Sequence, residues 1–338
     1  MKRNPKILIL TEGGKGIGFG HVARNVALCQ AFGEKQIYPK LLINGDGSFN
    51  NLLESNKYKI FDWLKNPNTT LDFIRKADIV IIDSYLAKID FYRKVSSLVK
   101  IAVYADDYKR MVYPRGIVVN GAISANNIDY PFRKDTVYML GPKYTALRKE
   151  FWYVPQRRVR RRIRSVMMTF GGHGLNDIMI VILKALAEKY PMVTKNIVIS
   201  NGLQDREKMN GIKDRNTNFI MNPDAEIMKK TMLHSEIAIS AGGQTLYELA
   251  RIGVPTIAVT VADNQINNIK GWTAAGFIKH AGSIMQNSKA RIAGNVIANI
   301  KLLENESERE YMSSVGRKFV DGQGAGRIVS MILARIGG

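Results

Sequence analysis

Short runs of aliphatic and β-branched residues alternate along the chain with longer segments whose apolar residues recur at helical spacing. In the first half these runs cover residues 6–10, 41–43, 78–83, 101–104 and 117–120. Each run is continuously apolar, which is typical of strands in a parallel sheet that is buried on both faces. A helical pattern over residues 21–32 follows the first run, and alternation of this kind predicts βαβ units.

The same pattern restarts after residue 164. Predicted strands cover residues 165–169, 196–199, 219–221, 237–239 and 257–261, with helical spacing over residues 177–190 and after Gly242-Gly243. The sequence therefore predicts an α/β protein with two Rossmann-like domains, over residues 1–150 and 165–338, joined by a basic linker over residues 151–164. The last helix of such a chain can return to the N-terminal domain. Ligands of such folds bind at the carboxyl ends of the strands and in the cleft between the domains.

Composition narrows the class of protein. The 338 residues are 46% apolar and 23% charged, which excludes wholesale disorder. The single cysteine, Cys29, excludes an internal disulfide framework and a cysteine-rich zinc site. No stretch approaches the roughly 18 apolar residues of a transmembrane helix, and the apolar run at residues 7–10 is too short for a signal peptide. We therefore expect a cytoplasmic protein.

The formal net charge of +21 suggests an anionic partner: nucleic acid, an anionic membrane or a phosphorylated small molecule. Lys and Arg exceed Asp and Glu by similar amounts in both halves, and the one dense cluster is six arginines between Arg157 and Arg164. A solvated linker and a contact with nucleic acid or anionic lipid both fit this cluster. No nucleic-acid-binding motif accompanies it, so we expect no nucleic-acid partner.

The first segment with candidate chemistry is the glycine-rich stretch from Gly13 to His21. Its glycines allow a sharp turn and a close approach to a ligand, but it lacks the full dinucleotide and P-loop signatures. His21 falls at the predicted start of a helix, where the helix dipole disfavours the imidazolium and leaves the ring able to accept a proton. A histidine that only packs at the helix start is the alternative interpretation.

Two further segments follow predicted strands of the second half. Gly242-Gly-Gln-Thr245 leads into a helix whose free backbone N–H groups can hold a diphosphate. Glu248 can bind the two hydroxyls of a ribose or complete a capping box with Thr245. Asp263-Asn264-Gln265 suits sugar or phosphate recognition, and an ordinary polar turn is the alternative.

Two more strand ends carry polar residues. Phe170-Gly-Gly-His173, with Asn176 beyond it, follows the first strand of the second half, and Asp83-Ser84-Tyr85 ends a strand of the first half. Tyr85 is either a site residue or a packed aromatic. No His-x-His, His-Glu-x-x-His or Gly-x-Ser-x-Gly spacing occurs, so we expect neither a metal site nor a serine nucleophile.

Taken together, these segments resemble a known family, and the resemblance extends over nearly the full length. The motifs that carry it are Gly16-Ile-Gly-Phe-Gly-His-Val-Ala-Arg24, Gly141-Pro-Lys-Tyr-Thr-Ala-Leu-Arg-Lys-Glu-Phe151, Thr169-Phe-Gly-Gly172, Ser240-Ala-Gly-Gly-Gln-Thr-Leu-Tyr-Glu-Leu249, Asp263-Asn-Gln265 and Asp321-Gly-Gln-Gly-Ala-Gly-Arg327. The chain resembles the UDP-2,4-diacetamido-2,4,6-trideoxy-β-L-altropyranose hydrolases of pseudaminic acid biosynthesis and the related spore coat polysaccharide biosynthesis proteins. The family has the GT-B architecture, two Rossmann-like domains that face each other across a cleft.

The resemblance implies an inverting hydrolysis of a UDP-sugar that needs no metal and no cofactor. It implies that His21 in the N-terminal domain is the general base and that the C-terminal domain binds UDP, with Glu248 on the ribose. The residues that would contact substrate are Gly18, Gly20, Arg24, Tyr85, Gly171, Gly172, His173, Gly242, Gly243, Gln244, Thr245, Glu248, Asp263, Asn264 and Gln265.

The chain departs from the family pattern at two places, Val22-Ala23 after the histidine and His173-Gly174-Leu175 after the double glycine. These departures concern the identity of the sugar more than the fold or the nucleotide. Two alternatives stay open: a GT-B glycosyltransferase or hydrolysing 2-epimerase that uses a UDP-amino sugar, and a basic protein that binds nucleic acid without catalysis.

Overall fold

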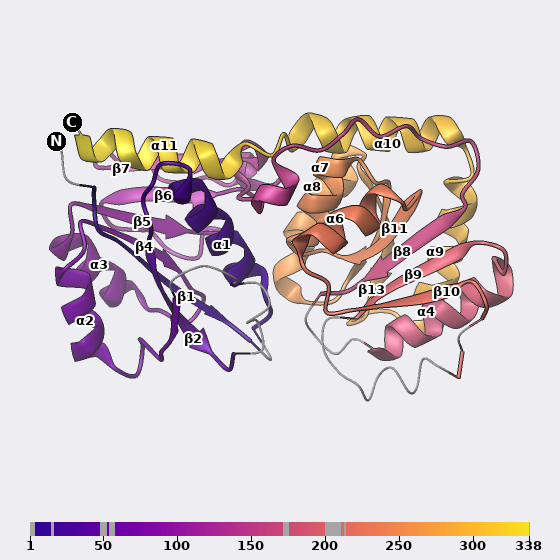
Figure 1. The fold of residues 1–338 in the computed structure, drawn as a ribbon, viewed down its shortest axis with the longest axis horizontal. Helices are drawn as coiled ribbons and strands as arrows, with labels where there is room; N and C mark the ends of the chain where they lie inside the picture. The colour runs from indigo at the N-terminus through magenta and orange to yellow at the C-terminus, as the bar shows by residue number, and fades with distance from the viewer. Residues whose placement is uncertain are drawn as a thin grey trace. The chain divides into compact units, whose positions relative to one another are not determined.

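The computed structural model describes residues 4–14, 17–47, 53, 58–171, 176–199, 211–212 and 214–337 (Figure 1). The chain forms two compact units. Unit 1 comprises residues 1–152 and 322–338, and unit 2 comprises residues 153–321. Within the part of the chain that is described, no helix combines the length and the apolar character needed to cross a bilayer.

Unit 1 is built on a parallel sheet of seven strands in the order β3-β2-β1-β4-β5-β6-β7. The strands are β1 (Ile7–Gly13), β2 (Lys40–Gly45), β3 (Tyr58–Ile60), β4 (Ile79–Asp83), β5 (Ile101–Ala105), β6 (Gly116–Asn120) and β7 (Thr136–Leu140). The helices are α1 (Gly20–Gly33), α2 (Pro67–Arg75), α3 (Ile89–Leu98) and α11 (Gly324–Gly337), with short 3₁₀ turns η2 (Ala125–Asn127), η3 (Pro142–Tyr144) and η4 (Lys149–Phe151).

Successive residues of the central strand face opposite layers, as period-two side chains must. Ile7 and Ile9 lie in the core with α1 and α11, whereas Leu8 and Leu10 lie in the core that α2 and α3 cover (Figure 1). Both layers exclude water from β1, which explains why its run is continuously apolar.

Unit 2 has a parallel sheet of six strands in the order β10-β9-β8-β11-β12-β13. The strands are β8 (Ser165–Thr169), β9 (Thr194–Ile199), β10 (Thr217–Met221), β11 (Ile237–Ala241), β12 (Thr256–Thr260) and β13 (Ile278–Ser283). The helices are α4 (Asn176–Lys189), α6 (Ala225–Leu233), α7 (Thr245–Ile252), α8 (Ile266–Ala275), α9 (Lys289–Leu302) and α10 (Glu306–Phe319), with the 3₁₀ turn η5 (Asp263–Gln265).

The two sheets share one topology. In each, the strand order reverses direction beside the first strand, between β1 and β4 in unit 1 and between β8 and β11 in unit 2. The carboxyl ends of strands at such a switch point form the usual ligand-binding crevice of open α/β sheets. The candidate site residues of both units lie at or just after these strand ends.

The basic segment differs from the solvated linker that its charge pattern predicts. Residues from Tyr153 onward belong to unit 2, and the Arg157 guanidinium is mostly buried there. Arg157 donates a hydrogen bond to the carbonyl oxygen of Gly253 (3.0 Å), and Arg160 forms an ion pair with the buried Glu236 (2.9 Å). Part of the arginine cluster therefore anchors the segment to unit 2.

Candidate active site

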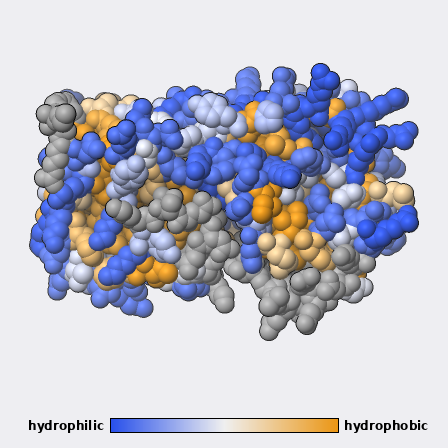
Figure 2. Space-filling view, in the orientation of Figure 1, coloured by the Kyte–Doolittle hydropathy of each residue, from blue (hydrophilic) through white to orange (hydrophobic). Residues whose placement is uncertain are grey.

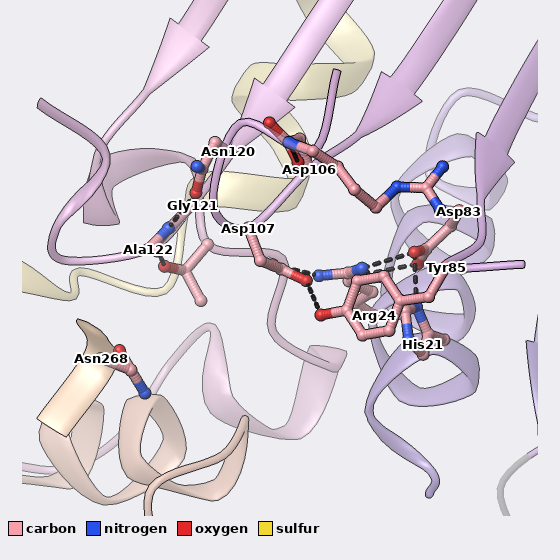
Figure 3. Close-up of polar contacts among 12 residues, drawn as sticks. His21, Arg24, Asp83, Tyr85, Asp106, Asp107, Asn120, Gly121, Ala122 and Asn268 are labelled. Carbon is pink, nitrogen blue, oxygen red and sulfur yellow. Dashed lines mark hydrogen bonds and ion pairs between the residues drawn. The ribbon is translucent and has the colours of Figure 1, made fainter. Parts of the chain in front are cut away.

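A buried histidine–carboxylate pair lies at the switch point of unit 1 (Figure 3). His21 stands in the first turn of α1 and Asp83 ends β4, and their Nδ1 and Oδ1 atoms are 2.6 Å apart. A carboxylate can only accept, so Nδ1 carries the proton of this hydrogen bond. The Nε2 atom is then the position of the ring that can take up a proton.

Arg24 lies one helical turn after His21, on the same face of α1. Its guanidinium donates to both oxygens of Asp83 and to Oδ1 of Asp107, the last at 2.7 Å. Its Nη2 also lies 3.1 Å from Nδ1 of His21, but that nitrogen already donates to Asp83 and cannot accept. The contacts of Arg24 thus make it a fixed counter-ion between two carboxylates.

The charges of this cluster keep one another ionised. Burial alone would raise the pKa of Asp83, but the positive charge of Arg24, together with the hydrogen bonds that Arg24 and His21 donate, holds it well below its ordinary value. The pKa of Asp107 is lowered in the same way against its burial, again by Arg24 first. Burial would lower the pKa of Arg24, yet Asp107 and Asp83 raise it well above the usual value.

Tyr85 joins the cluster through both its ring and its hydroxyl. The hydroxyl donates to Asp107, and the ring meets the ring of His21 edge-on, with centroids 4.4 Å apart. Burial, followed by the charge of Asp107, raises the pKa of Tyr85, so the phenol stays neutral. The structure therefore brings together His21, Arg24 and Tyr85, three of the residues selected from the sequence.

Three further residues complete the cluster. Glu12, at the end of β1, is buried and accepts from the Tyr85 backbone N–H (2.6 Å) and the Ser84 hydroxyl (2.5 Å). Asn25 donates to Asp83 at 2.7 Å, and Asp107 holds Tyr85. The helix spacing of Asn25 from His21 and the strand-end position of Asp107 were signals in the sequence. Glu12 has the same signal, because it follows the first apolar run directly before the glycine-rich stretch.

The glycine-rich loop after β1 is closed by backbone hydrogen bonds. Gly14 and Gly18 donate to each other's carbonyl oxygens at 3.2 and 2.9 Å. Both have positive φ, +131° and +91°, which favours glycine at these positions. This closure leads the chain directly into Gly20, where α1 begins and presents His21.

In unit 2, the turn after β11 is held by side chains from α8 and the turn before it. The N–H of Gly242 donates to Oε1 of Gln265 (3.0 Å), and its carbonyl oxygen accepts from Nδ2 of Asn268 (2.6 Å). The hydroxyl of Tyr247 donates to Oδ1 of Asn268 (2.6 Å). A Cβ on Gly242 would lie 2.7 Å from Ile269, whereas one on Gly243 would have nothing nearer than 3.9 Å.

The other sequence-selected residues of unit 2 fall into three groups. Thr245 begins α7 after Gln244, and the buried Glu248 lies in the first turn of that helix. Asp263 and Asn264 are exposed in η5, while the Gln265 oxygen accepts from the backbone of Gly242 and Val261. Gly171 is exposed with φ +76°, and Gly172 and His173 lie outside the described residues.

Among the described side chains, no three His, Cys, Asp or Glu residues are grouped as metal ligands would be. The lone thiol, Cys29, lies on the buried side of α1, where burial raises its pKa to about 12. A thiol with such a pKa stays protonated near neutral pH and is a poor nucleophile.

Comparisons with known proteins place these observations in a family context. Residues 165–322 match the family model of the glycosyltransferase family 28 C-terminal domain. An uncharacterized protein of Methanocaldococcus jannaschii is 25% identical, over 75% of this chain and 55% of its own length. A Helicobacter pylori protein named pseudaminic acid cytidylyltransferase and UDP-2,4-diacetamido-2,4,6-trideoxy-beta-L-altropyranose hydrolase is 27% identical, over 63% of this chain and 40% of its own length.

A third relative is similar over its whole length. The spore coat polysaccharide biosynthesis protein SpsG of Bacillus subtilis is 20% identical, over 96% of both chains. By contrast, the chain spans only about half the length of the first two relatives, those of Methanocaldococcus jannaschii and Helicobacter pylori.

Solved structures show the same fold. MnaA of S. aureus, in a co-structure with UDP, superposes with a TM-score of 0.68 at 14% identity, over 98% of this chain and 97% of that one. MurG of Acinetobacter baumannii gives 0.62 at 17% identity, over 98% and 100%. The resemblance carried by the motifs is confirmed, and the chain has the GT-B fold of two Rossmann-like units, with its second unit matching the glycosyltransferase family 28 C-terminal domain.

Proposed function

We propose that the protein is a nucleotide-sugar hydrolase. It would cleave the anomeric C–O bond of a UDP-diacetamido-trideoxy sugar, invert the configuration, and release UDP and the free sugar. The observation that carries this proposal is the buried His21–Asp83 pair, in which the 2.6 Å hydrogen bond fixes the ring tautomer and leaves Nε2 as the base. General-base assistance of this kind contributes roughly 10²–10⁴-fold to the rate.

In the proposed reaction, a water molecule transfers a proton to Nε2 of His21 while its oxygen attacks the anomeric carbon. The C–O bond to the diphosphate breaks on the opposite face, and its electron pair leaves with UDP. Asp83 stabilises the imidazolium that forms, because its carboxylate accepts from Nδ1 and stays ionised beside Arg24. The neutral phenol of Tyr85 packs against the imidazole ring and limits its rotation.

The nucleotide would bind to unit 2. The first turn of α7 offers backbone N–H groups for the diphosphate, and the buried Glu248 in that turn is the candidate partner of the ribose. The open space at Gly243 permits the close approach that a phosphate needs. MnaA of S. aureus, which shares the fold, was solved together with UDP, so UDP is a reasonable nucleotide to test.

The choice of sugar rests on the relatives. The Helicobacter pylori relative is named as a hydrolase of UDP-2,4-diacetamido-2,4,6-trideoxy-beta-L-altropyranose, and this chain shares its family motifs. A transferase or a hydrolysing 2-epimerase is the second candidate, since the calicheamicin glycosyltransferase CalG4 and a UDP-GlcNAc 2-epimerase of Neisseria meningitidis have the same fold.

A product analysis tests the proposal. The protein is incubated with UDP-amino sugars in ¹⁸O-labelled water, with and without EDTA, and the products are followed by phosphorus and proton NMR and by mass spectrometry. We expect UDP and free sugar, with the label on the sugar, the anomer inverted and no effect of EDTA. Label on UDP, or no turnover until an acceptor is added, would contradict the hydrolase. A product epimerised at C2 would identify the 2-epimerase.

The base is tested by His21→Asn. We expect turnover to fall roughly 10²–10⁴-fold because the proton acceptor is lost, whereas UDP affinity measured by calorimetry stays unchanged because unit 2 is intact. His234→Asn serves as the matched control, since His234 is exposed and the one described hydrogen bond of its side chain is to the Lys230 carbonyl. Near-normal turnover of His21→Asn would remove His21 from the mechanism.

A further inference from the structure

The proposed site leaves the arginine cluster of unit 2 unexplained, and the structure divides that cluster into two groups. Arg157 and Arg160 are held by unit 2, through the Gly253 carbonyl and the Glu236 carboxylate. The remaining four are exposed, and no described carboxylate forms an ion pair with them: Arg158, Arg161, Arg162 and Arg164.

The backbone of this segment is tied down along α10 (Figure 1). The fully buried Arg309 of α10 donates to the carbonyl oxygens of Arg160 and Arg161, the second at 3.0 Å. Arg317, in the last turn of α10, donates to the carbonyl oxygen of Pro155 at 3.2 Å. The exposed arginines therefore project from an ordered strip of backbone.

Positive charge exceeds negative charge along this strip. Residues 153–164 together with α10 contain nine Lys and Arg against three Asp and Glu. Of those three carboxylates, Glu308 pairs with Lys279 at 2.6 Å. Among the described carboxylates, Glu236 is the one that contacts the segment, and it already accepts from Arg160 and from the backbone N–H of Arg164 and Ser165. Repulsion within such a cluster destabilises the fold unless an external anion compensates it.

The segment and α10 also carry exposed aromatic rings. Tyr153 precedes the arginines and is 81% exposed, and Tyr311 and Phe319 of α10 are 55% and 36% exposed. Polar side chains form a broad band over this part of unit 2 (Figure 2). Aromatic rings beside basic residues are typical of surfaces that sit in the headgroup layer of a membrane.

The segment has little that could recognise nucleic-acid bases. Besides arginines, residues 157–164 contain only Val159 and Ile163, so neither an aromatic ring nor an amide lies between the charges. Single-stranded nucleic acids are usually bound by aromatic rings interleaved with the basic groups. Guanidinium groups alone recognise phosphate.

We propose that this arginine face, comprising Arg158, Arg161, Arg162 and Arg164 with the exposed Tyr153 that precedes them, docks unit 2 onto an anionic phospholipid surface. Each arginine near such a surface strengthens binding by about fivefold, so the four together contribute up to several hundred-fold at low salt. Docking of this kind would hold the enzyme at a membrane independently of its reaction.

The test is sedimentation of the full-length protein with vesicles of phosphatidylcholine, with or without about one third phosphatidylglycerol. We expect binding to the anionic vesicles only, with a steep decrease at high salt. The variant with all four arginines changed to Gln should lose roughly several hundred-fold in vesicle affinity, whereas the variant with all four changed to Lys should keep most of it.

A matched control removes the same charge from unit 1, through Gln at four exposed lysines: Lys35, Lys59, Lys94 and Lys134. This control should bind the anionic vesicles within a few-fold of wild type. Equal losses in both Gln variants, or equal binding to neutral vesicles, would overturn the proposal. If a short RNA binds more tightly than the vesicles, in a salt-dependent way, the face would be assigned to nucleic acid instead.

Thermal melting shows whether the arginine variant is folded. Its vesicle affinity is measured without any sugar substrate, so the result does not depend on the proposed hydrolase activity.

Discussion

The two units share one topology, but the carboxyl ends of their sheets have opposite chemistry. In unit 1 the strand ends carry buried ionised side chains, of which Asp83 after β4 is the centre. In unit 2 the equivalent strand, β11, is followed by Gly242 and Gly243, and side-chain amides hold this turn. Under the proposed function, unit 1 would move protons and unit 2 would present backbone N–H groups to an anion.

The difference follows from what each task requires. A general base needs a charged partner that fixes its tautomer, and a buried carboxylate meets this need only if a cation such as Arg24 compensates it. A phosphate needs donors that approach closely, and glycine next to a helix N-terminus provides them without adding charge. Exchanging these features between the units would impair both functions.

The largest effect should come from Asp83→Asn. Loss of the carboxylate removes the charge that stabilises the imidazolium and leaves Arg24 partly uncompensated, so we expect turnover to fall roughly 10²–10⁴-fold. UDP affinity should not change, as calorimetry can show. Asp78→Asn is the control, because Asp78 lies at the other end of the same strand and pairs with Lys100 (2.8 Å). A similar loss of turnover in Asp83→Asn and Asp78→Asn would contradict a specific role of Asp83 in the reaction.

The reverse pattern is expected for Gly243→Ala. The protein has room for the added methyl group, with the nearest atom 3.9 Å away, so thermal stability should stay close to wild type. A diphosphate at this turn would meet the methyl group, and we expect UDP affinity to fall roughly 10–100-fold. Gly294→Ala, also in open space, controls for the substitution itself. Unchanged UDP affinity of Gly243→Ala would move the diphosphate away from this turn.

A smaller effect is expected for Asn268→Ala. Its Nδ2 donates to the Gly242 carbonyl at 2.6 Å, so its loss loosens the turn without removing a ligand. We expect the KM for the UDP-sugar to rise about tenfold, with kcat at saturation nearly unchanged, because a hydrogen bond lost at a buried carbonyl costs about 1–3 kcal/mol. Asn267→Ala changes an exposed neighbour and should have no effect. A fall in kcat instead would link Asn268 to the chemistry.

The smallest effect concerns stability in acid. The pKa of Asp107 is lowered in the folded protein, so its contribution to stability is fully present above the unfolded pKa of about 3.9 and is lost as the pH falls through the folded value. Asp107→Asn should therefore weaken the pH dependence of the unfolding free energy below about pH 4 and leave it unchanged between pH 5 and 7. Denaturant titrations across this range provide the measurement. A change confined to neutral pH would contradict the assignment.

The sequence predicts the fold class and the motifs well because both depend on local patterns. The continuous apolar runs identify β1, β4 and β8, and the position of His21 at a helix start follows from the glycine-rich loop. Strands that contain polar or exposed residues are not identified by apolar runs. All three residues of β3 are exposed, and β13 carries Lys279 and His280, so neither shows a buried apolar run.

The side-chain contacts of the site depend on strand order, which the sequence does not contain. His21 meets Asp83 because β4 pairs with β1, although 62 positions separate the two residues. Gln265 was selected as a substrate contact, yet its oxygen accepts from two backbone N–H groups because β11 and β12 are neighbours. Its role at the substrate stays a prediction.

The return of α11 to unit 1 has a consequence for synthesis on the ribosome. The core of unit 1 includes Ala325, Ile328, Val329 and Ile332, which pack with α1 but are translated after all of unit 2. Unit 2 is continuous in sequence and can complete its core first, while an apolar face of α1 in unit 1 stays exposed until α11 is synthesised. Partly folded chains with such exposed apolar surface tend to aggregate and are bound by chaperones.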